Sequence, residues 1–211
     1  MATSETLEEL WRATAGRLAA KNLLGPAASL SLRCPDTPQM WFADSPAANP
    51  RRVTSDASTV ADEARIHAVI YDLRGDAGAI AWGGGMFGTM LGRFGGALPE
   101  LFDEQIRHIG LMPPPVDSEA ALATALKGGA NALMLRGKPL CLGMTARRLA
   151  LNAELFEKCS TAYVLAAASG GDLTRVPRWV QRIAAGRLGT DEKRAAEAFA
   201  AGCLPVDSNK Y

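Results

Sequence analysis

The chain has 211 residues, of which 48% are hydrophobic and 21% are charged, and its mean hydropathy is near zero. These values are typical of one compact domain with a large core, and they exclude a disordered chain and a coiled coil. The 23 Lys and Arg residues against 22 Asp and Glu residues leave a net charge of +1. Composition therefore favours neither nucleic acid nor an anionic membrane as a partner.

The N-terminal segment and the cysteines indicate a cytoplasmic protein. No stretch approaches the roughly 18 uninterrupted apolar residues of a membrane span, and the first residues are acidic where a secretory signal is basic and then apolar. The cysteines are far apart and form no Cys-x-x-Cys pair. We therefore expect buried, reduced thiols and no zinc knuckle or disulfide frame. These cysteines are Cys34, Cys141, Cys159 and Cys203.

The first third of the chain predicts two helices around a β-hairpin. Thr6 and Glu9 have the spacing of a capping box at the start of a helix. A period-two alternation follows at 29–33, and a proline-rich turn separates it from 40–42. The expected elements are a helix over 6–21, strands at 29–33 and 40–42, a loop over 45–56, and a helix that begins near Ser58 or Thr59 and stops at Gly75.

The remaining residues predict a second hairpin and several more helices. The expected elements are a buried strand over 77–82, a short helix through Met90, a glycine-rich loop over 92–99, a segment of uncertain type over 100–109, a helix from Ser118 to Leu126, strands at 131–135 and 140–142 joined by a turn at 137–139, a helix over 146–168, and one or two helices over 179–203. We find no internal repeat, so residues 1–211 are predicted to form a single domain with 170–211 as a C-terminal helical extension.

This order of elements resembles the class II aldolase/adducin family, whose members include fuculose phosphate aldolase and ribulose phosphate epimerases. Residues 24–33 are similar to the family's Gly-Thr-Ser-Gly-Asn-Ile-Ser-Val-Arg segment, and residues 63–74 to its Glu-x-x-x-His-x-x-Ile-Tyr-x-x-Arg helix. Residues 76–81 and 131–136 look like the strands that carry the family's metal site. The resemblance spans about residues 5–170.

The resemblance implies a three-layer α/β/α class II aldolase-like domain with a mostly antiparallel central sheet. Family members are commonly homotetramers, so a homo-oligomer is expected here, with Trp11, Trp179 and Phe199 as candidate contact residues.

The family's metal ligands are missing from the matching positions. Family members bind a divalent metal through a His-x-His pair and a third histidine, because neutral imidazoles hold the ion and leave positions open for substrate oxygens. The corresponding positions here are Trp82, Gly84 and Lys138, and the chain has only two histidines, His67 and His108. A lysine ammonium would also repel a metal ion. We therefore expect no metal and no other cofactor.

The family's phosphate pocket also has altered residues. The matching stretches are 28–29, 45–48 and 61–62, and the last of these introduces Asp62, whose carboxylate would repel a phosphate. A phosphorylated sugar is thus not the expected substrate, although Ser29 and Ser45 could bind a smaller anion. The candidate residues for binding a small molecule are Ser29, Ser45, Asp62, Trp82, Gly83 and Gly84.

Three residues are candidates for catalysis. Glu63 occupies the family's acid/base position, Lys138 could stabilise an enolate or carboxylate or form a Schiff base, and His108 is the histidine that no motif uses. The alternative is structural, with Glu63 and Lys138 as a buried ion pair in place of the metal and Trp82 filling the space left by the imidazoles.

Two functions therefore stay open. The first is a metal-independent lyase or isomerase acting on a small non-phosphorylated carbonyl or carboxylate compound. The second is a catalytically inactive paralogue that binds a small molecule or serves as a structural partner subunit.

Overall fold

The structure is a computed structural model that describes residues 4–25, 27–45, 47–60 and 62–206, and the side chains of 4–6, 62 and 63 lie outside this description. Its elements are α1 (Ser4–Ala20), β1 (Ser29–Arg33), β2 (Gln39–Ala43), β3 (Arg51–Thr54), α2 (Asp62–Leu73), β4 (Ala79–Trp82), α3 (Met86–Met90), the 3₁₀ helix η1 (Leu91–Phe94), α4 (Asp103–His108), α5 (Glu119–Leu126), β5 (Ala132–Leu135), β6 (Lys138–Gly143), α6 (Ala146–Ala168) and α7 (Arg178–Ala200). None of these helices is both long enough and apolar enough to cross a membrane.

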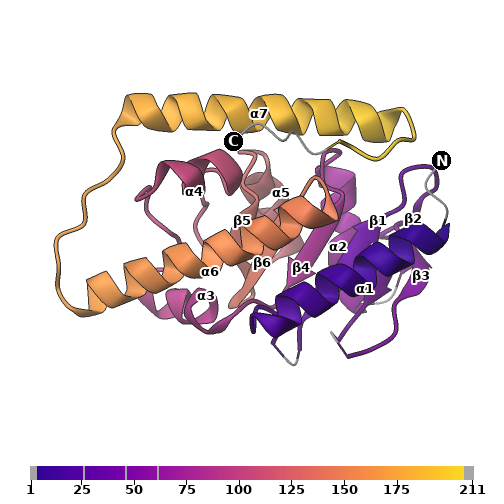
Figure 1. The fold of residues 1–211 in the computed structure, drawn as a ribbon, viewed down its shortest axis with the longest axis horizontal. Coiled ribbons are helices and arrows are strands. Elements are labelled where there is room, and N and C mark those ends of the chain that lie inside the picture. The colour runs from indigo at the N-terminus through magenta and orange to yellow at the C-terminus, as the bar shows by residue number, and fades with distance from the viewer. Residues whose placement is uncertain (1–3, 26, 46, 61, 207–211) are drawn as a thin grey trace.

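The centre of the fold is a six-stranded sheet in the order β3-β2-β1-β4-β6-β5. Each pair of neighbouring strands is antiparallel. Helices α1 and α6 cover one face, and α2 and α5 cover the other (Figure 1). The predicted three-layer α/β/α architecture with an antiparallel sheet is therefore confirmed.

Strand β1 shows why the sheet has two different faces. Successive side chains of a strand point to opposite sides, so Leu30 and Leu32 join the core beneath α1 and α6. Ser29 and Ser31 point the other way and reach the side chain of His67 on α2. The alternation seen in the sequence thus separates an apolar layer from a buried polar contact.

Side-chain caps define the starts of α5 and α6 where the sequence predicted them. Ser118 Oγ accepts a hydrogen bond from the backbone N–H of Ala121, three residues later. Thr145 Oγ1 does the same for Arg148. Such oxygens satisfy backbone donors that lack a partner in the first turn.

The hairpin between β5 and β6 turns earlier than predicted. Arg136 and Gly137 have positive φ angles of 50° and 73°, as a two-residue hairpin turn requires. Leu135 pairs with Lys138 across it. The prediction of a turn over 137–139 was therefore wrong, because Lys138 and Pro139 already belong to β6.

Two differences concern the segment before α2. Residues 51–54, predicted as loop, form edge strand β3 beside β2. The strand is short, with Arg51 and Arg52 exposed and the next two residues half-buried, so it lacks the apolar alternation that marks a buried strand. Ser58 does not begin α2, because its backbone N–H and its hydroxyl both donate to Asp56 Oδ1 in a separate turn.

Several predicted surface and core assignments were also reversed. Trp11 is 2% exposed and its indole donates to the Leu30 carbonyl oxygen. Phe199 is 6% exposed and lies beneath the Arg33 guanidinium. Neither side chain is available for a subunit contact, whereas Trp179 is exposed. Cys203, expected to be buried, is exposed, while the other three cysteines are buried and free as predicted.

Helix α7 lies across the end of the sheet where β6 leads into α6 (Figure 1). A buried network of charged side chains links it to the loop after α2. Arg74 makes two hydrogen bonds to Asp76, at 2.8 and 2.7 Å, and a 2.9 Å ion pair to Glu192 of α7. A small apolar cluster of Met144, Leu188 and Ala195 adds to the contact. The predicted C-terminal helical segment is thus a single helix packed on the domain.

Candidate functional site

Trp82 and Lys138 meet where β4 ends and β6 begins. The Lys138 ammonium lies 5.4 Å from the centroid of the Trp82 ring, within the range of a cation–π contact. Lys138 Nζ also donates to the Ala27 carbonyl oxygen at 3.4 Å. Trp82 Nε1 donates to the Leu135 carbonyl oxygen at 3.3 Å, and its ring packs on the core on the α2 and α5 side. The structure therefore brings two of the predicted site residues together.

Gly83 and Gly84 close this end of the sheet by tight packing. Gly83 N–H donates to the Pro139 carbonyl oxygen at 2.8 Å. A Cβ atom placed on Gly84 would lie 2.4 Å from Pro139 Cγ, and one placed on Gly83 would lie 2.4 Å from Ala28 Cβ. Gly84 also has a φ of +87°, a backbone conformation that residues other than glycine rarely adopt. The Pro139 ring thus occupies the space that a side chain at position 84 would need.

These residues do not fit a divalent metal. Indole and glycine supply no metal ligand, and an ammonium group repels a cation. Among the residues that the structure describes, no three His, Cys, Asp or Glu side chains are grouped so that they could hold a metal ion. Trp82, Gly84 and Lys138 therefore offer no ligand set for a metal ion.

His67 and Ser29 belong to a buried network between α2 and β1. His67 is fully buried, with Nε2 at 2.8 Å from Ser29 Oγ and Nδ1 at 2.7 Å from Ser31 Oγ. The Tyr71 hydroxyl lies 2.8 Å from Ser31 Oγ. Burial lowers the pKa of His67 to about 3, so the ring is neutral at pH 7. Ser29, predicted to bind a small molecule, thus has its hydroxyl engaged by this imidazole.

The other residues predicted for this end are only partly described. Ser45 lies at the same end as Ser29, because β1 and β2 pair Leu30 with Ala43. Its Oγ accepts a hydrogen bond from Ala47 N–H. The backbone of Asp62 and Glu63 begins α2, but both side chains lie outside the described part of the chain. The predicted roles of Asp62 and Glu63 stay predictions.

His108 lies at the opposite end of the sheet. Its Nδ1 is hydrogen-bonded to the Arg148 guanidinium, and Arg148 follows β6 at the edge where Gly143 pairs with Ala79. Trp82 pairs with Leu140 at the other end of the same two strands. The structure therefore does not bring His108 to Lys138 as a shared catalytic pair.

Glu157 belongs to this region but was not among the residues predicted for the site. Its two carboxylate oxygens accept hydrogen bonds from the Phe87 and Gly88 N–H groups, each at 2.8 Å. The carboxylate therefore caps the first turn of α3, where negative charge is favourable. The two partners are about 70 residues apart in sequence, so no local pattern indicates the contact.

Solved structures of several known proteins superpose on this chain. No protein-family model and no curated protein sequence matches it. L-fuculose 1-phosphate aldolase from Glaciozyma antarctica superposes with a TM-score of 0.72 at 17% identity, over 95% of this chain and 92% of that one. YgbL from Klebsiella pneumoniae gives 0.71 at 17%, over 85% and 98%. An aldolase II superfamily protein from Pseudomonas syringae gives 0.68 at 18%, over 92% and 90%.

The chain has the class II aldolase-like fold. The likeness extends over most of this chain and of its structural neighbours. At 17–18% identity it concerns the arrangement of the backbone, because one fold can support unrelated activities. The chemistry of the class II aldolase-like domain described here therefore depends on its own side chains.

Proposed function

We propose that this protein is a catalytically inactive member of the class II aldolase-like fold group that serves as a small-molecule-binding or structural partner subunit. The packing at Gly84 carries the proposal. A ligating side chain there would place its Cβ 2.4 Å from Pro139 Cγ, so this position has no room for one. The adjacent cation, Lys138, would oppose a metal ion further.

The engagement of Ser29 supports the same proposal for the substrate side. The residue is 4% exposed, and its hydroxyl oxygen lies 2.8 Å from His67 Nε2. The Ser29 residue is buried and its hydroxyl is already engaged by the imidazole, so it offers little accessible surface to an anion. Binding of a sugar phosphate at this end is therefore disfavoured.

Metal analysis combined with an aldol-cleavage assay tests the proposal. The protein is purified without chelators or a metal-binding tag, and its metal content is measured by elemental analysis. Cleavage of fuculose 1-phosphate and of non-phosphorylated hydroxy acids is then assayed with and without added Zn²⁺ or Mn²⁺. We expect less than stoichiometric metal and no turnover. Stoichiometric metal together with cleavage that a chelator abolishes would overturn the proposal.

The position of Lys138 favours a second candidate, a metal-independent lyase or isomerase for a small non-phosphorylated carbonyl or carboxylate compound. The ammonium group stands over Trp82 with a backbone carbonyl as its hydrogen-bond partner. It could stabilise a developing enolate, with Glu63 as acid/base and Trp82 as the wall of the site. This candidate requires turnover that Lys138→Met and Glu63→Gln abolish without unfolding the protein. Lys127→Met, on an exposed residue at the end of α5, is the matched control.

The predicted homotetramer remains a prediction, as does the absence of nucleic-acid partners. Sedimentation velocity of the full chain measures the assembly state directly. Because Trp179 is 68% exposed, Trp179→Ser should lower the sedimentation coefficient if α7 forms a subunit contact.

A further inference from the structure

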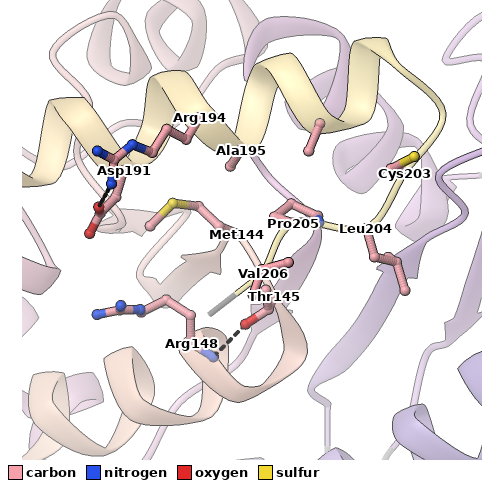
Figure 2. Close-up of a pocket in the computed structure, with 11 residues that line it drawn as sticks. Met144, Thr145, Arg148, Asp191, Arg194, Ala195, Cys203, Leu204, Pro205 and Val206 are labelled. Carbon is pink, nitrogen blue, oxygen red and sulfur yellow. Dashed lines mark hydrogen bonds and ion pairs between the residues drawn. The ribbon is translucent and has the colours of Figure 1, made fainter. Parts of the chain in front are cut away.

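Three arginines from three helices lie near one aspartate at the end of the sheet opposite Trp82 and Lys138. Arg107 of α4 forms a 2.6 Å ion pair with Asp191 of α7, and Arg194 of α7 lies 3.9 Å from the same carboxylate. Arg148 of α6 completes the group from below (Figure 2). Arg107 and Arg194 pair with Asp191, whereas the recorded side-chain partner of Arg148 is His108, so three positive charges lie near one negative charge. We call these four residues the arginine cluster.

Arg148 is the least compensated member of the arginine cluster. It is 9% exposed, and its guanidinium is hydrogen-bonded to His108 Nδ1. Burial, together with the charges of Arg148 and Arg107, lowers the pKa of His108 to about 4, so its imidazole is neutral and offers no counter-charge. No acidic side chain in the described part of the chain forms an ion pair with Arg148. A buried cation without a counterion is costly, and arginine does not lose its proton in proteins.

Arg107 adds a second unsatisfied group. Its Nη1 is buried and has no hydrogen-bond partner among the described residues. Nearby carboxylates do not supply one: Glu192, one residue after Asp191, is turned toward Arg74. Asp103 and Glu104 are exposed on α4, in the neighbouring groove. The arginine cluster therefore has more positive than negative charge, although Arg107 itself lines the neighbouring groove and not the cavity beside Arg148 and Arg194.

A cavity of about 410 Å³ opens beside the cluster. Figure 2 shows Arg148, Asp191 and Arg194 on one side of it and Cys203 and Leu204 on the other. Its remaining walls are mostly apolar, formed by Met144, Ala195, Ala198, Leu204, Pro205 and Val206. The volume lies in the range of about 300–1,000 Å³ typical of small-molecule sites, which combine apolar walls with a few polar groups.

We propose that this cavity binds a small monocarboxylate with an apolar body, whose carboxylate pairs with Arg148 and Arg194 and whose body lies against Leu204 and Val206. A guanidinium matches the two oxygens of a carboxylate. A phosphate dianion suits the site less well, because Asp191 lines the same cavity and repels a dianion about twice as strongly as a monocarboxylate. The inference goes beyond the proposed function: it concerns the opposite end of the sheet and holds whether or not Lys138 takes part in catalysis.

Calorimetric titration of the full-length protein with hexanoate at low salt tests this site. We expect saturable binding with one site per chain, and weaker or no binding of hexan-1-ol and inorganic phosphate. Arg148→Met should weaken hexanoate binding by about tenfold or more, because it removes a charged hydrogen-bond donor. Arg194→Gln should weaken it by a smaller factor, because the Arg194 side chain is 71% exposed. Arg182→Gln, at an exposed position of α7 that lines none of these cavities, should leave binding unchanged.

Several results would overturn the proposal. One is the absence of saturable hexanoate binding. Others are hexan-1-ol binding as tightly as hexanoate, phosphate binding more tightly than hexanoate, and hexanoate binding that is weakened by neither Arg148→Met nor Arg194→Gln. Arg148→Met should stay folded, because replacing a poorly compensated buried charge by an apolar side chain is often neutral. Should it unfold, Arg194→Gln at the exposed rim carries the test. Because metal content and aldol cleavage are separate readouts, failure here is distinguishable from failure of the proposed function.

Discussion

Gly84→Ala measures how tightly the Trp82–Lys138 end of the sheet is closed. The new Cβ would lie 2.4 Å from Pro139 Cγ and 2.6 Å from Pro139 Cβ. Pro139 is buried in β6 and its ring is rigid, so it has little room to move away. Overpacking of this kind costs about 1–3 kcal/mol of stability.

The backbone contributes a second cost that a control can remove. Gly84 has a φ of +87°, and Gly95 has a φ of +90° with no heavy atom within 4 Å of an added Cβ. An alanine in a left-handed conformation costs about 1–2 kcal/mol, and part of this is offset because alanine restricts the unfolded chain. Gly95→Ala should therefore lose about 1 kcal/mol, and Gly84→Ala about 2–4 kcal/mol, the difference being the contact with Pro139.

Urea unfolding of the wild type and the two variants, followed by circular dichroism, gives both free energies of unfolding. Helix α1 supplies a further reference, because Gly16 has open space around it and Gly16→Ala should stabilise the protein by up to about 1 kcal/mol. Equal losses for Gly84→Ala and Gly95→Ala would refute the reasoning. Position 84 would then have room for a side chain, and the proposed loss of metal chemistry would lose its main support.

Three further predictions concern buried charges. Burial raises the pKa of Glu192 from 4.5 to about 7, opposed by Arg74 and assisted by Asp76. The folded state then holds this proton more strongly, so stability falls as pH rises from about 4.5 to 7. As pH rises from 4.5 to 7, the free energy of unfolding of Glu192→Gln should increase by up to about 3 kcal/mol relative to that of the wild type. A difference in urea midpoint between the two proteins that stays constant over this pH range would contradict the prediction. The pKa of His67 is lowered to about 3 by burial, so stability falls by up to about 5 kcal/mol as pH drops from 6.5 to 3. In His67→Gln the free energy of unfolding should depend less on pH over this range. A His67 pKa near 6.5, measured by NMR in the folded wild type, would contradict the prediction. Asp76→Asn leaves the Arg74 side chain, 7% exposed, without its two-point partner and should cost about 3 kcal/mol. Exposed Asp36→Asn serves as the control, and similar losses in both variants would contradict the assignment.

Local chemistry made much of the fold predictable. The Ser118 and Thr145 caps act within three residues, so the starts of α5 and α6 can be read from the chain. The alternation at 29–33 likewise anticipated a strand with one apolar face. Edge strand β3 was missed because its residues are exposed or half-buried and carry no pattern of burial.

The candidate site was harder to predict because its contacts are between distant segments. Ser29 lies 38 residues from His67, and Arg107 lies 84 residues from Asp191. Residue type alone indicated that Ser29 could bind a small anion, and no local pattern indicated a partner for Arg107. Only the folded arrangement shows that one hydroxyl is engaged and that three arginines converge. The family resemblance placed Trp82, Gly84 and Lys138 at matching positions of one site, although the predicted pair was Glu63 with Lys138 and the contact found is between Lys138 and Trp82.

The two borders of the sheet restrict how this protein can associate with others. At one border, β3 presents Arg51 and Arg52 to solvent, and charged side chains discourage pairing with another strand. At the other border, Val116 pairs with β5: its N–H donates to the Met134 carbonyl oxygen, and its carbonyl oxygen accepts from Arg136 N–H. Strand addition is thus discouraged by exposed arginines at the β3 border. At the β5 border, the backbone groups of Met134 and Arg136 are already hydrogen-bonded to Val116. Assembly with a second copy, and resistance to fibrillar aggregation, should therefore be governed by the helical faces.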